Sequence, residues 1–253
     1  MEVTVLGSGT VTPSLKRNAS GLLIRSSDTW VLVDMGPGTI RRMCEAGIDC
    51  KRLDAILVTH FHPDHVSDLV PFLFASNYEY NAVREEEFHL IGPKGLEQFY
   101  GAQVGIYGDW IVPKGDRLRI REMNAEAPDV LTLKDLVIRS RPAVHSYPCV
   151  SYRVEADGVS VTVSGDTDVS EDLVSLARDT DLLICESSMP DHLKVRGHLV
   201  PSEAGRIAAS AGAKRLLLTH FYPPCDEVDV AAQAAEAFPG EIIRAEDLMR
   251  FAV

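Results

Sequence analysis

Short runs of apolar residues, separated by turn-forming residues, mark the first third of the chain. Strands are predicted where these runs occur, over residues 1–7, 20–26, 29–36 and 53–60. A helix is predicted from about Thr39 to Ala46, because Gly47 follows it. A second helix is predicted from Val66 to about Tyr80, where apolar residues recur at helical spacing.

The middle of the chain returns to strand-like runs, over residues 88–93, 135–144, 150–156 and 159–167. Beyond these runs, helices are predicted over about 170–178, 203–212 and 230–238, and strands over 181–187 and 215–220. Ser202 is expected to cap the helix that ends at Gly212. Strand-rich stretches interleaved with helices at both ends predict a layered α/β protein, with its sheets between helices.

Length and charge narrow the classes of function. A chain of 253 residues can bury one large core, so residues 1–253 are expected to form a single domain. The formal net charge is −12, from 37 acidic and 25 basic residues. Such a surface repels a polyphosphate backbone at long range, which disfavours a long nucleic acid as partner and leaves small substrates open.

Nothing along the chain resembles a secretion or membrane signal. The sequence enters a predicted strand at once, and it has no apolar stretch of about 18 residues that could cross a bilayer. The five cysteines form no C-x-x-C pair and are interpreted as buried or incidental residues, as suits a reducing cytosol. We therefore expect a cytoplasmic protein with no membrane partner.

Four potential metal ligands follow the apolar run LDAILV within six residues: His60, His62, Asp64 and His65. Neutral imidazole and carboxylate are the ligand types that suit zinc and similar first-row ions. If buried without a metal, these groups would lack partners, which is costly. The alternative is a histidine-rich surface loop, but three histidines beside an aspartate at a strand end favour a metal site.

The pattern His60-x-His62-x-Asp64-His65 resembles the signature of the metallo-β-lactamase superfamily. The resemblance implies a four-layer αββα sandwich and three further ligands downstream. Candidates occur in the right order, each where a predicted strand ends, at His145, Asp166 and His220. By resemblance, one metal is held by His60, His62 and His145, the other by Asp64, His65 and His220, and Asp166 bridges them. Two divalent ions are implied, with Zn²⁺ first by affinity order and Mn²⁺ or Fe²⁺ as alternatives.

Other segments resemble the ribonuclease Z-like branch of that superfamily. They are LGSGTVTPSLKRNASGLLI near the N-terminus and the turn that begins with Asp34, which we expect to brace the ligand loop. Glu186 and His198 resemble a pair in which the histidine assists the leaving group and the glutamate orients it. Here Leu199 and Val200 replace the usual Ser and Thr after that histidine. A homodimer is common in this branch.

One departure from the branch concerns its long RNA-gripping arm. In members that process transfer RNA, the arm usually lies between the third metal histidine and the bridging aspartate. Here His145 and Asp166 are only 21 positions apart, and the residues between them read as strand–turn–strand. This argues against efficient transfer-RNA maturation. A short insert at residues 75–88 could shape the pocket instead.

The resemblance implies a metal-dependent hydrolase, and we predict a phosphodiesterase that acts on small or cyclic phosphodiesters. A hydroxide bridging the metals would attack phosphorus, with Asp64 orienting or deprotonating it. His198, braced by Glu186, would protonate the leaving oxygen or stabilise the transition state. The alternatives are a lactone or thioester hydrolase with the same dinuclear site, a ribonuclease Z-like transfer-RNA 3′ endonuclease and, more remotely, a non-catalytic metal-binding protein.

Overall fold

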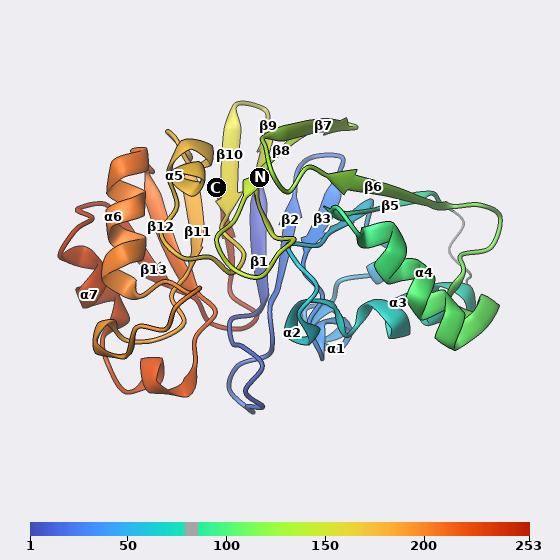
Figure 1. Ribbon diagram of the computed structural model, residues 1–253, viewed down its shortest axis with the longest axis horizontal. Coiled ribbons are helices and arrows are strands. Elements are labelled where there is room, and N and C mark those ends of the chain that lie inside the picture. Colours follow the sequence, from blue (N-terminus) through green and yellow to red (C-terminus); the bar gives the residue numbers. More distant parts are fainter. Residues whose placement is uncertain (79–85) are drawn as a thin grey trace.

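Two β-sheets face each other and helices cover the outer face of each (Figure 1). The computed structural model describes residues 1–78 and 86–253. In this part of the chain the first sheet runs, in spatial order, β14 (Arg250–Ala252), β1 (Glu2–Gly7), β2 (Gly21–Arg25), β3 (Trp30–Val33), β4 (Ala55–Leu57), β5 (Phe88–Pro93) and β6 (Leu118–Met123). The second sheet runs β13 (Glu241–Arg244), β12 (Arg215–Thr219), β11 (Leu182–Glu186), β10 (Val159–Val163), β9 (Val150–Ala156), β8 (Leu136–Pro142) and β7 (Asp129–Leu133). The αββα sandwich predicted from the sequence is confirmed.

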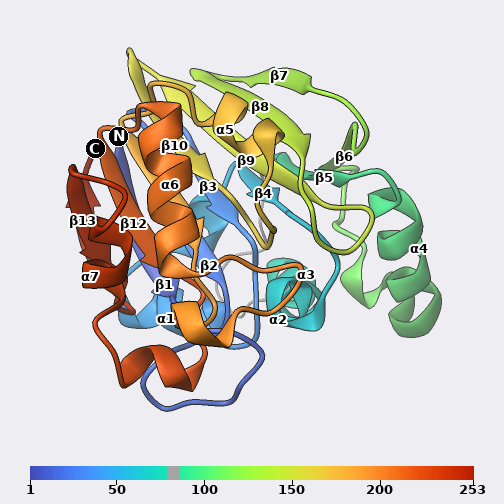
Figure 2. The ribbon, with the colours of Figure 1, turned by 60° about the vertical axis from the view of Figure 1, so that its left-hand side comes forward.

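The helices form the two outer layers of the sandwich. On the side of the first sheet lie α1 (Thr39–Glu45), α2 (Pro63–Val66), α3 (Leu69–Tyr78) and α4 (Leu96–Tyr107). On the side of the second sheet lie α5 (Glu171–Leu176), α6 (Pro201–Ala211) and α7 (Val230–Ala235), as Figure 2 shows. Short 3₁₀ turns add η1 (Cys50–Arg52), η2 (Gly108–Ile111), η3 (Asp191–Leu193) and η4 (Pro223–Asp226).

The central strands of each sheet are buried on both faces, which explains why they read as nearly continuous apolar runs. In β3, Val31 and Val33 belong to the core between the sheets, whereas Leu32 belongs to the core beneath the helices of the first layer. Tyr152 in β9 is fully buried and donates a hydrogen bond from its hydroxyl to the carbonyl oxygen of Val58, 2.8 Å away. This bond ties the second sheet to the residue that follows β4 in the first.

The strands that precede the candidate ligands run parallel within each sheet. In the first sheet β3 pairs in parallel with β4, and in the second β10, β11 and β12 pair in parallel. In parallel sheets of this kind the carboxyl ends of the strands meet at one edge, where ligands bind. Thr59, Asp166, Glu186 and His220 all lie at or just beyond such ends, so the topology gathers residues that are far apart in sequence.

Two predicted helices differ from the structure, and one helix was not predicted. The helix predicted over 66–80 is two helices, α2 and α3, interrupted where the Asp68 carboxylate accepts a hydrogen bond from the Ile40 backbone N–H of α1 (2.9 Å). Its predicted end, with residues 79–85 of the insert predicted at 75–88, lies outside the described residues. Helix α6 begins at Pro201 and not after Ser202, because proline is favoured at the first helical position. Helix α4 lies in a stretch where only strands were predicted.

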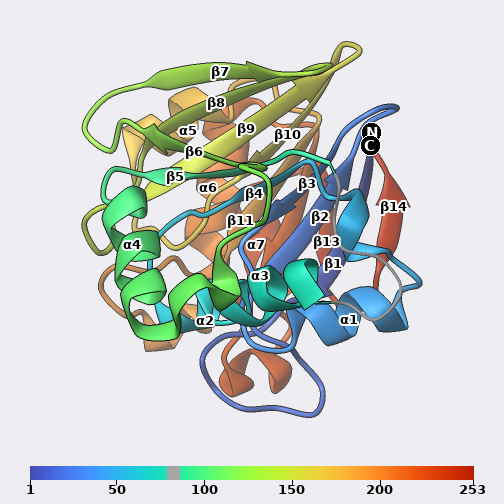
Figure 3. The same cartoon turned by 90° about the vertical axis from the view of Figure 1, so that its right-hand side faces the viewer.

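The two ends of the described chain lie side by side (Figure 2 and Figure 3). Strand β14 pairs antiparallel with β1, with Val3 opposite Phe251, and the Val253 N–H donates to the Met1 carbonyl oxygen at 3.0 Å. Within the described residues we find no helix that combines the length and the apolar character needed to traverse a lipid bilayer.

Candidate metal centre

The loop after β4 carries the first four candidate ligands. His60 is fully buried at the end of the strand, whereas His62 is exposed and serves as the N-cap residue of α2. Pro63 occupies the start of that helix, where its missing N–H is not needed. Asp64 and His65 follow in the first turn and are both buried. The short helix thus turns the chain between His62 and Asp64, so that the first two candidate ligands face one position and the last two face a neighbouring one.

The three downstream candidates meet this loop. His60, His62, His145 and Asp166 form one group and Asp64, His65 and His220 a second, and within each group the ligand atoms lie within 4.8 Å of one another. Asp166 lies between the groups. Its Oδ1 is 3.3 Å from His220 Nε2, and its Oδ2 is 3.4 Å from His65 Nε2 and 3.8 Å from both His60 Nε2 and His145 Nε2.

The donor atoms of this cluster fit divalent metal ions. In the described chain, the Nε2 atoms of His60, His65 and His220 are buried without a hydrogen-bond partner. Leaving three such atoms unpaired around one carboxylate is costly, and a cation at their meeting point would satisfy them. The imidazole and carboxylate set also has the chemistry that zinc and related ions prefer.

Asp34 fixes the ligand loop through three contacts. Its Oδ1 accepts a hydrogen bond from the Thr59 N–H (2.8 Å), and its Oδ2 accepts one from the Thr59 hydroxyl (2.9 Å) and faces His65 Nδ1 at 2.7 Å. Thr59 Oγ1 in turn lies 3.0 Å from His60 Nδ1. Because the Nδ1 atoms of both histidines are held in this way, their Nε2 atoms are left to face the cluster.

Two residues with a left-handed backbone conformation position candidate ligands at the ends of strands in the second sheet. Gly165 has φ 58°, and a Cβ at this position would lie 2.9 Å from the side chain of Thr59, so only glycine allows the segment before Asp166 to approach the ligand loop so closely. His220 itself has φ 62°, which ends β12 at the site. Non-glycine residues held in this conformation are characteristic of functional sites.

The charge states of His60, His145 and Asp64 suit metal binding. Burial, aided by the neighbouring imidazoles, lowers the pKa of His60 to about 2, so this ring is neutral at physiological pH. Burial likewise lowers the pKa of His145. Burial alone would raise the pKa of Asp64, but its contact with His220 and the charge of His65 lower this pKa to about 2. Neutral imidazoles and an ionised carboxylate are the forms that coordinate metals. Burial would lower the pKa of His65, but neighbouring carboxylates outweigh it and raise this pKa, so His65 must lose a proton to bind a metal.

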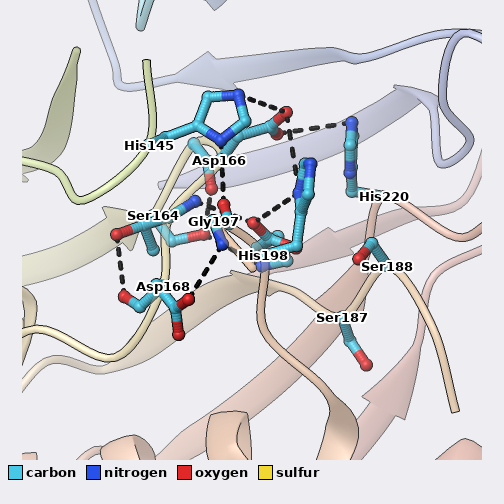
Figure 4. Close-up of polar contacts among 12 residues, drawn as sticks. His145, Ser164, Asp166, Asp168, Ser187, Ser188, Gly197, His198 and His220 are labelled. Carbon is cyan, nitrogen blue, oxygen red and sulfur yellow. Dashed lines mark hydrogen bonds and ion pairs between the residues drawn. The ribbon is translucent and has the colours of Figure 1, made fainter. Parts of the chain in front are cut away.

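His198 lies beside Asp166 (Figure 4), and Glu186 contacts its ring. His198 Nδ1 is 3.0 Å from Glu186 Oε1 and 4.0 Å from Asp166 Oδ2, and its ring stacks on His220 with centroids 5.7 Å apart. Burial lowers the pKa of His198, but the hydrogen bond and charge of Glu186 and the carboxylates of Asp166 and Asp64 outweigh it and raise this pKa above its usual value. The arrangement can hold a proton next to the metal cluster.

Several residues that shape the site were not singled out by the sequence analysis. Thr59 contacts both Asp34 and His60, and the repeated Thr-His at the ends of β4 and β12 was the signal that could have revealed it. Asp168 and Gly197 contact the loops that carry His145 and His198. An isolated aspartate or glycine on a loop carries no sequence signal for such a role.

An apolar cavity of about 950 Å³ adjoins the ligand loop on the side of α3 and α4. Phe61 and Pro63, which flank His62, form part of its wall, and Phe61 stacks on Phe99 with ring centroids 4.8 Å apart. Residues 79–85 of the insert at 75–88, which was predicted to shape a pocket, lie outside the described chain.

A sandwich of this topology, with a His/Asp cluster across the ends of both sheets, is typical of metal-dependent hydrolases. The family profile described as "Beta-lactamase superfamily domain" matches residues 29–221. A ribonuclease Z from Mycobacterium sp. (strain KMS) is 30% identical in an alignment of 278 positions, which covers 100% of this chain and 96% of the relative. The chain therefore belongs to the metallo-β-lactamase superfamily.

Solved structures agree with this assignment. The metallo-β-lactamase fold protein YhfI from Bacillus subtilis superposes with a TM-score of 0.83 at 25% identity, covering 99% of this chain and 98% of that one. The short form of human tRNase Z superposes with a TM-score of 0.82 at 25% identity, covering 100% of this chain and 99% of that one.

Proposed function

We propose that this metal-dependent hydrolase is a phosphodiesterase that acts on small or cyclic phosphodiesters. One observation carries the proposal: His198, hydrogen-bonded to Glu186, lies next to the carboxylate shared by both ligand groups. Hydrolysis of an alkyl phosphodiester expels a poor leaving group that needs a proton, and this pair can supply one. A lactone opened by attack at a carbonyl carbon has less need of such an acid.

The metal-binding roles follow the grouping of the donor atoms. One ion would be held by His60, His62 and His145, a second by Asp64, His65 and His220, and Asp166 would contact both. When bound, two divalent ions would polarise the phosphodiester and acidify the attacking water. Zinc is our first choice by affinity order, with manganese or iron as alternatives.

The protein residues would orient the reactants and handle the protons. The ionised Asp64 would orient the attacking water by accepting a hydrogen bond from it, or would deprotonate it. Glu186 holds Nδ1 of His198, so Nε2 is the ring nitrogen that can protonate the leaving oxygen. Glu186 Oε1 also accepts a hydrogen bond from the Thr167 N–H at 2.7 Å, which fixes the carboxylate against the strand end that bears Asp166.

Two features favour a small substrate over a transfer RNA. Between His145 and Asp166 the chain forms only the β9–β10 hairpin, so this stretch contains no long arm. The net charge of −12 disfavours a long polyanion. The similarity to ribonuclease Z over the whole chain nevertheless makes transfer-RNA 3′ cleavage the second candidate.

The activity can be tested on purified protein loaded with zinc or manganese. Bis(p-nitrophenyl) phosphate, a 2′,3′-cyclic nucleotide, a lactone, a thioester and a precursor transfer RNA would be assayed side by side, with Asp64→Ala as the blank. We expect cleavage of the first two that vanishes in the blank. Turnover of the lactone or thioester alone would refute the proposal, and cleavage of the precursor RNA alone would favour the second candidate.

Substrates with different leaving groups can distinguish proton donation by His198 from stabilisation of charge. Nitrophenolate leaves readily without a proton, whereas the alkoxide of a cyclic nucleotide does not. A His198→Ala variant should therefore lose about 10²–10⁴-fold in kcat on the cyclic nucleotide and far less on bis(p-nitrophenyl) phosphate. An equal loss on both would mean that His198 stabilises charge and does not donate a proton.

We also propose a homodimer, and we assign its interface to the apolar face formed by α3, α4 and η2. Phe74, Ile106, Tyr107 and Trp110 are all exposed there around the cavity described above. Clustered exposed aromatics of this kind mark association surfaces. Sedimentation equilibrium should give twice the mass of the chain, and Trp110→Glu should shift it toward the monomer; a wild-type monomer would overturn the assignment.

A further inference from the structure

Three consecutive residues, Asp166, Thr167 and Asp168, contact every loop that completes the candidate site from the second sheet. The Asp168 N–H donates to the Val144 carbonyl oxygen at 2.8 Å, and the Val144 N–H donates to Thr167 Oγ1 at 3.0 Å. These two bonds hold the residue just before His145. The segment that supplies the shared carboxylate therefore also fixes the position of a ligand from the loop after β8.

The Asp168 side chain holds the loop between β11 and α6. Its Oδ2 accepts a hydrogen bond from the Gly197 N–H at 2.8 Å, and its Oδ1 accepts one from Lys194 Nζ at 2.8 Å. Lys194 also pairs with Glu203, whose carboxylate accepts the Val200 N–H at 3.2 Å. The loop is thus fastened at both sides of His198, to the strand end by Asp168 and to the first turn of α6 by Glu203.

Gly197 connects this loop to the third metal histidine. Its carbonyl oxygen lies 2.8 Å from His145 Nδ1, and the next residue in the chain is His198 (Figure 4). His198 in turn contacts Glu186. With Nδ1 of His145 held by a carbonyl oxygen, its Nε2 is left to face Asp166 at 3.8 Å. A shift of Gly197 would therefore move the ligand His145 and the proton donor His198 together.

We propose that Asp168 is a positioning residue that couples metal binding to proton donation, by fixing Gly197 between His145 and His198. The metal-binding half of this proposal stands on the donor cluster alone, and the catalytic half rests on the proposed phosphodiesterase activity. The competing interpretation is a peripheral ion pair between Asp168 and Lys194. Partly exposed pairs of that kind contribute little, and nothing at the site would depend on it.

The chain offers a matched control for the test. Asp181 also pairs with a lysine, Lys214 at 2.7 Å, and also accepts a backbone N–H, from Ser160 at 2.8 Å. The two aspartate side chains are similarly exposed, 23% for Asp168 and 20% for Asp181. Asp181 precedes β11 and so lies at the end of the strand away from Glu186. An Asp181→Ala variant loses the same kinds of contact without touching the site.

The experiment compares Asp168→Ala, Asp168→Asn, Lys194→Met and Asp181→Ala in the full chain. Zn²⁺ affinity is measured by competition with a chromophoric chelator, the ligand field by the visible spectrum with Co²⁺, and kcat and KM with the cyclic nucleotide. We expect Asp168→Ala to weaken Zn²⁺ binding by about 10–100-fold, alter the Co²⁺ spectrum and lower kcat more than KM changes. Asp168→Asn keeps a hydrogen-bond acceptor for the Gly197 N–H, so it should recover most of the Zn²⁺ affinity and most of kcat. Lys194→Met should behave as wild type in all these measurements.

The readouts separate failure of the coupling from failure of the proposed activity. If Asp168→Ala matches Asp181→Ala in Zn²⁺ affinity and Co²⁺ spectrum, the positioning role is wrong. If Lys194→Met reproduces the effects of Asp168→Ala, the ion pair is responsible and the Gly197 contact is not. If the metal readouts change as expected but no phosphodiester is cleaved by the wild type, the metal-binding half holds, whereas the proposed function and the catalytic half fail.

Discussion

At the scale of single residues, the site depends on which nitrogen of each histidine carries the proton. Asp34 adopts a left-handed backbone conformation, φ 60°, at the end of β3, and its carboxylate contacts Thr59 and His65. A carboxylate can only accept hydrogen bonds, so when His65 is neutral, as a metal ligand must be, its one proton sits on Nδ1. Its Nε2 then carries the lone pair that a metal ligand needs.

Replacing Asp34 with asparagine tests this dependence, because Asn tolerates the left-handed conformation and preserves the size of the side chain. If its amide NH₂ takes the place of Oδ2, it faces His65 Nδ1 and favours the tautomer with the proton on Nε2. We expect Asp34→Asn to bind Zn²⁺ about 10–100-fold more weakly, measured by chelator competition. The control is Asp54→Asn. Asp54 lies at the opposite end of β4 and accepts a hydrogen bond from the Trp30 N–H. Equal affinity in the two variants would refute the tautomer argument.

At the scale of elements, the packing of α6 on α7 depends on a missing side chain. A Cβ at Gly205 in α6 would lie 2.4 Å from the Ala234 carbonyl oxygen of α7, whereas a Cβ at Gly101 in α4 would meet no atom within 4 Å. Glycine normally weakens a helix because it loses more conformational freedom than alanine on folding. The two glycines should therefore respond in opposite ways to the same substitution.

We expect Gly101→Ala to raise the free energy of unfolding by about 0.5–1 kcal/mol, which is the difference in helix propensity. Gly205→Ala should lower it by about 1–3 kcal/mol, because two backbones must separate to admit the methyl group. Urea unfolding followed by circular dichroism measures both. A stabilised Gly205→Ala variant would show that α7 moves away at no cost.

The sequence predicts some of these elements well and others poorly, for physical reasons. Strands buried on both faces, such as β4 and β12, appear as unbroken apolar runs that lead to a candidate ligand, so the positions of these strands were readable. Helix α4 was missed because it contains Gly101 and Gly105 and only its Leu96 is buried, which leaves a weak amphipathic pattern. Contacts such as Asp168 with Gly197 join loops 29 positions apart, and local patterns cannot reveal them.

At the scale of the whole molecule, the proposed metal centre joins the two sheets. Its candidate ligands come from the end of β4 in the first sheet and from the ends of β8, β10 and β12 in the second. A ligand that binds only the folded state stabilises it in proportion to the logarithm of its concentration over its Kd. Metal binding should therefore stabilise the sandwich as a whole and not one loop.

Removal of the metal should accordingly lower the melting temperature. At a free Zn²⁺ concentration of about 1,000 times Kd, binding contributes about 4 kcal/mol, which corresponds to a shift of roughly 10 °C for a chain of this size. Differential scanning calorimetry with a chelator, and again after Zn²⁺ or Mn²⁺ is restored, measures the shift. The Asp166→Ala variant should show a much smaller shift in melting temperature. Identical melting with and without chelator in the wild type would mean that the cluster does not bind these ions.

The pairing of β14 with β1 has a consequence for the growing polypeptide. Strand β1 is synthesised well before its partner on one side, which is made of residues 250–252. Until the ribosome has made those residues, the backbone N–H and C=O groups on that side of β1 form an open sheet edge, which can pair with another nascent chain. The separation of β1 and β14 along the sequence therefore sets how long this side of the first sheet is open to aggregation during synthesis.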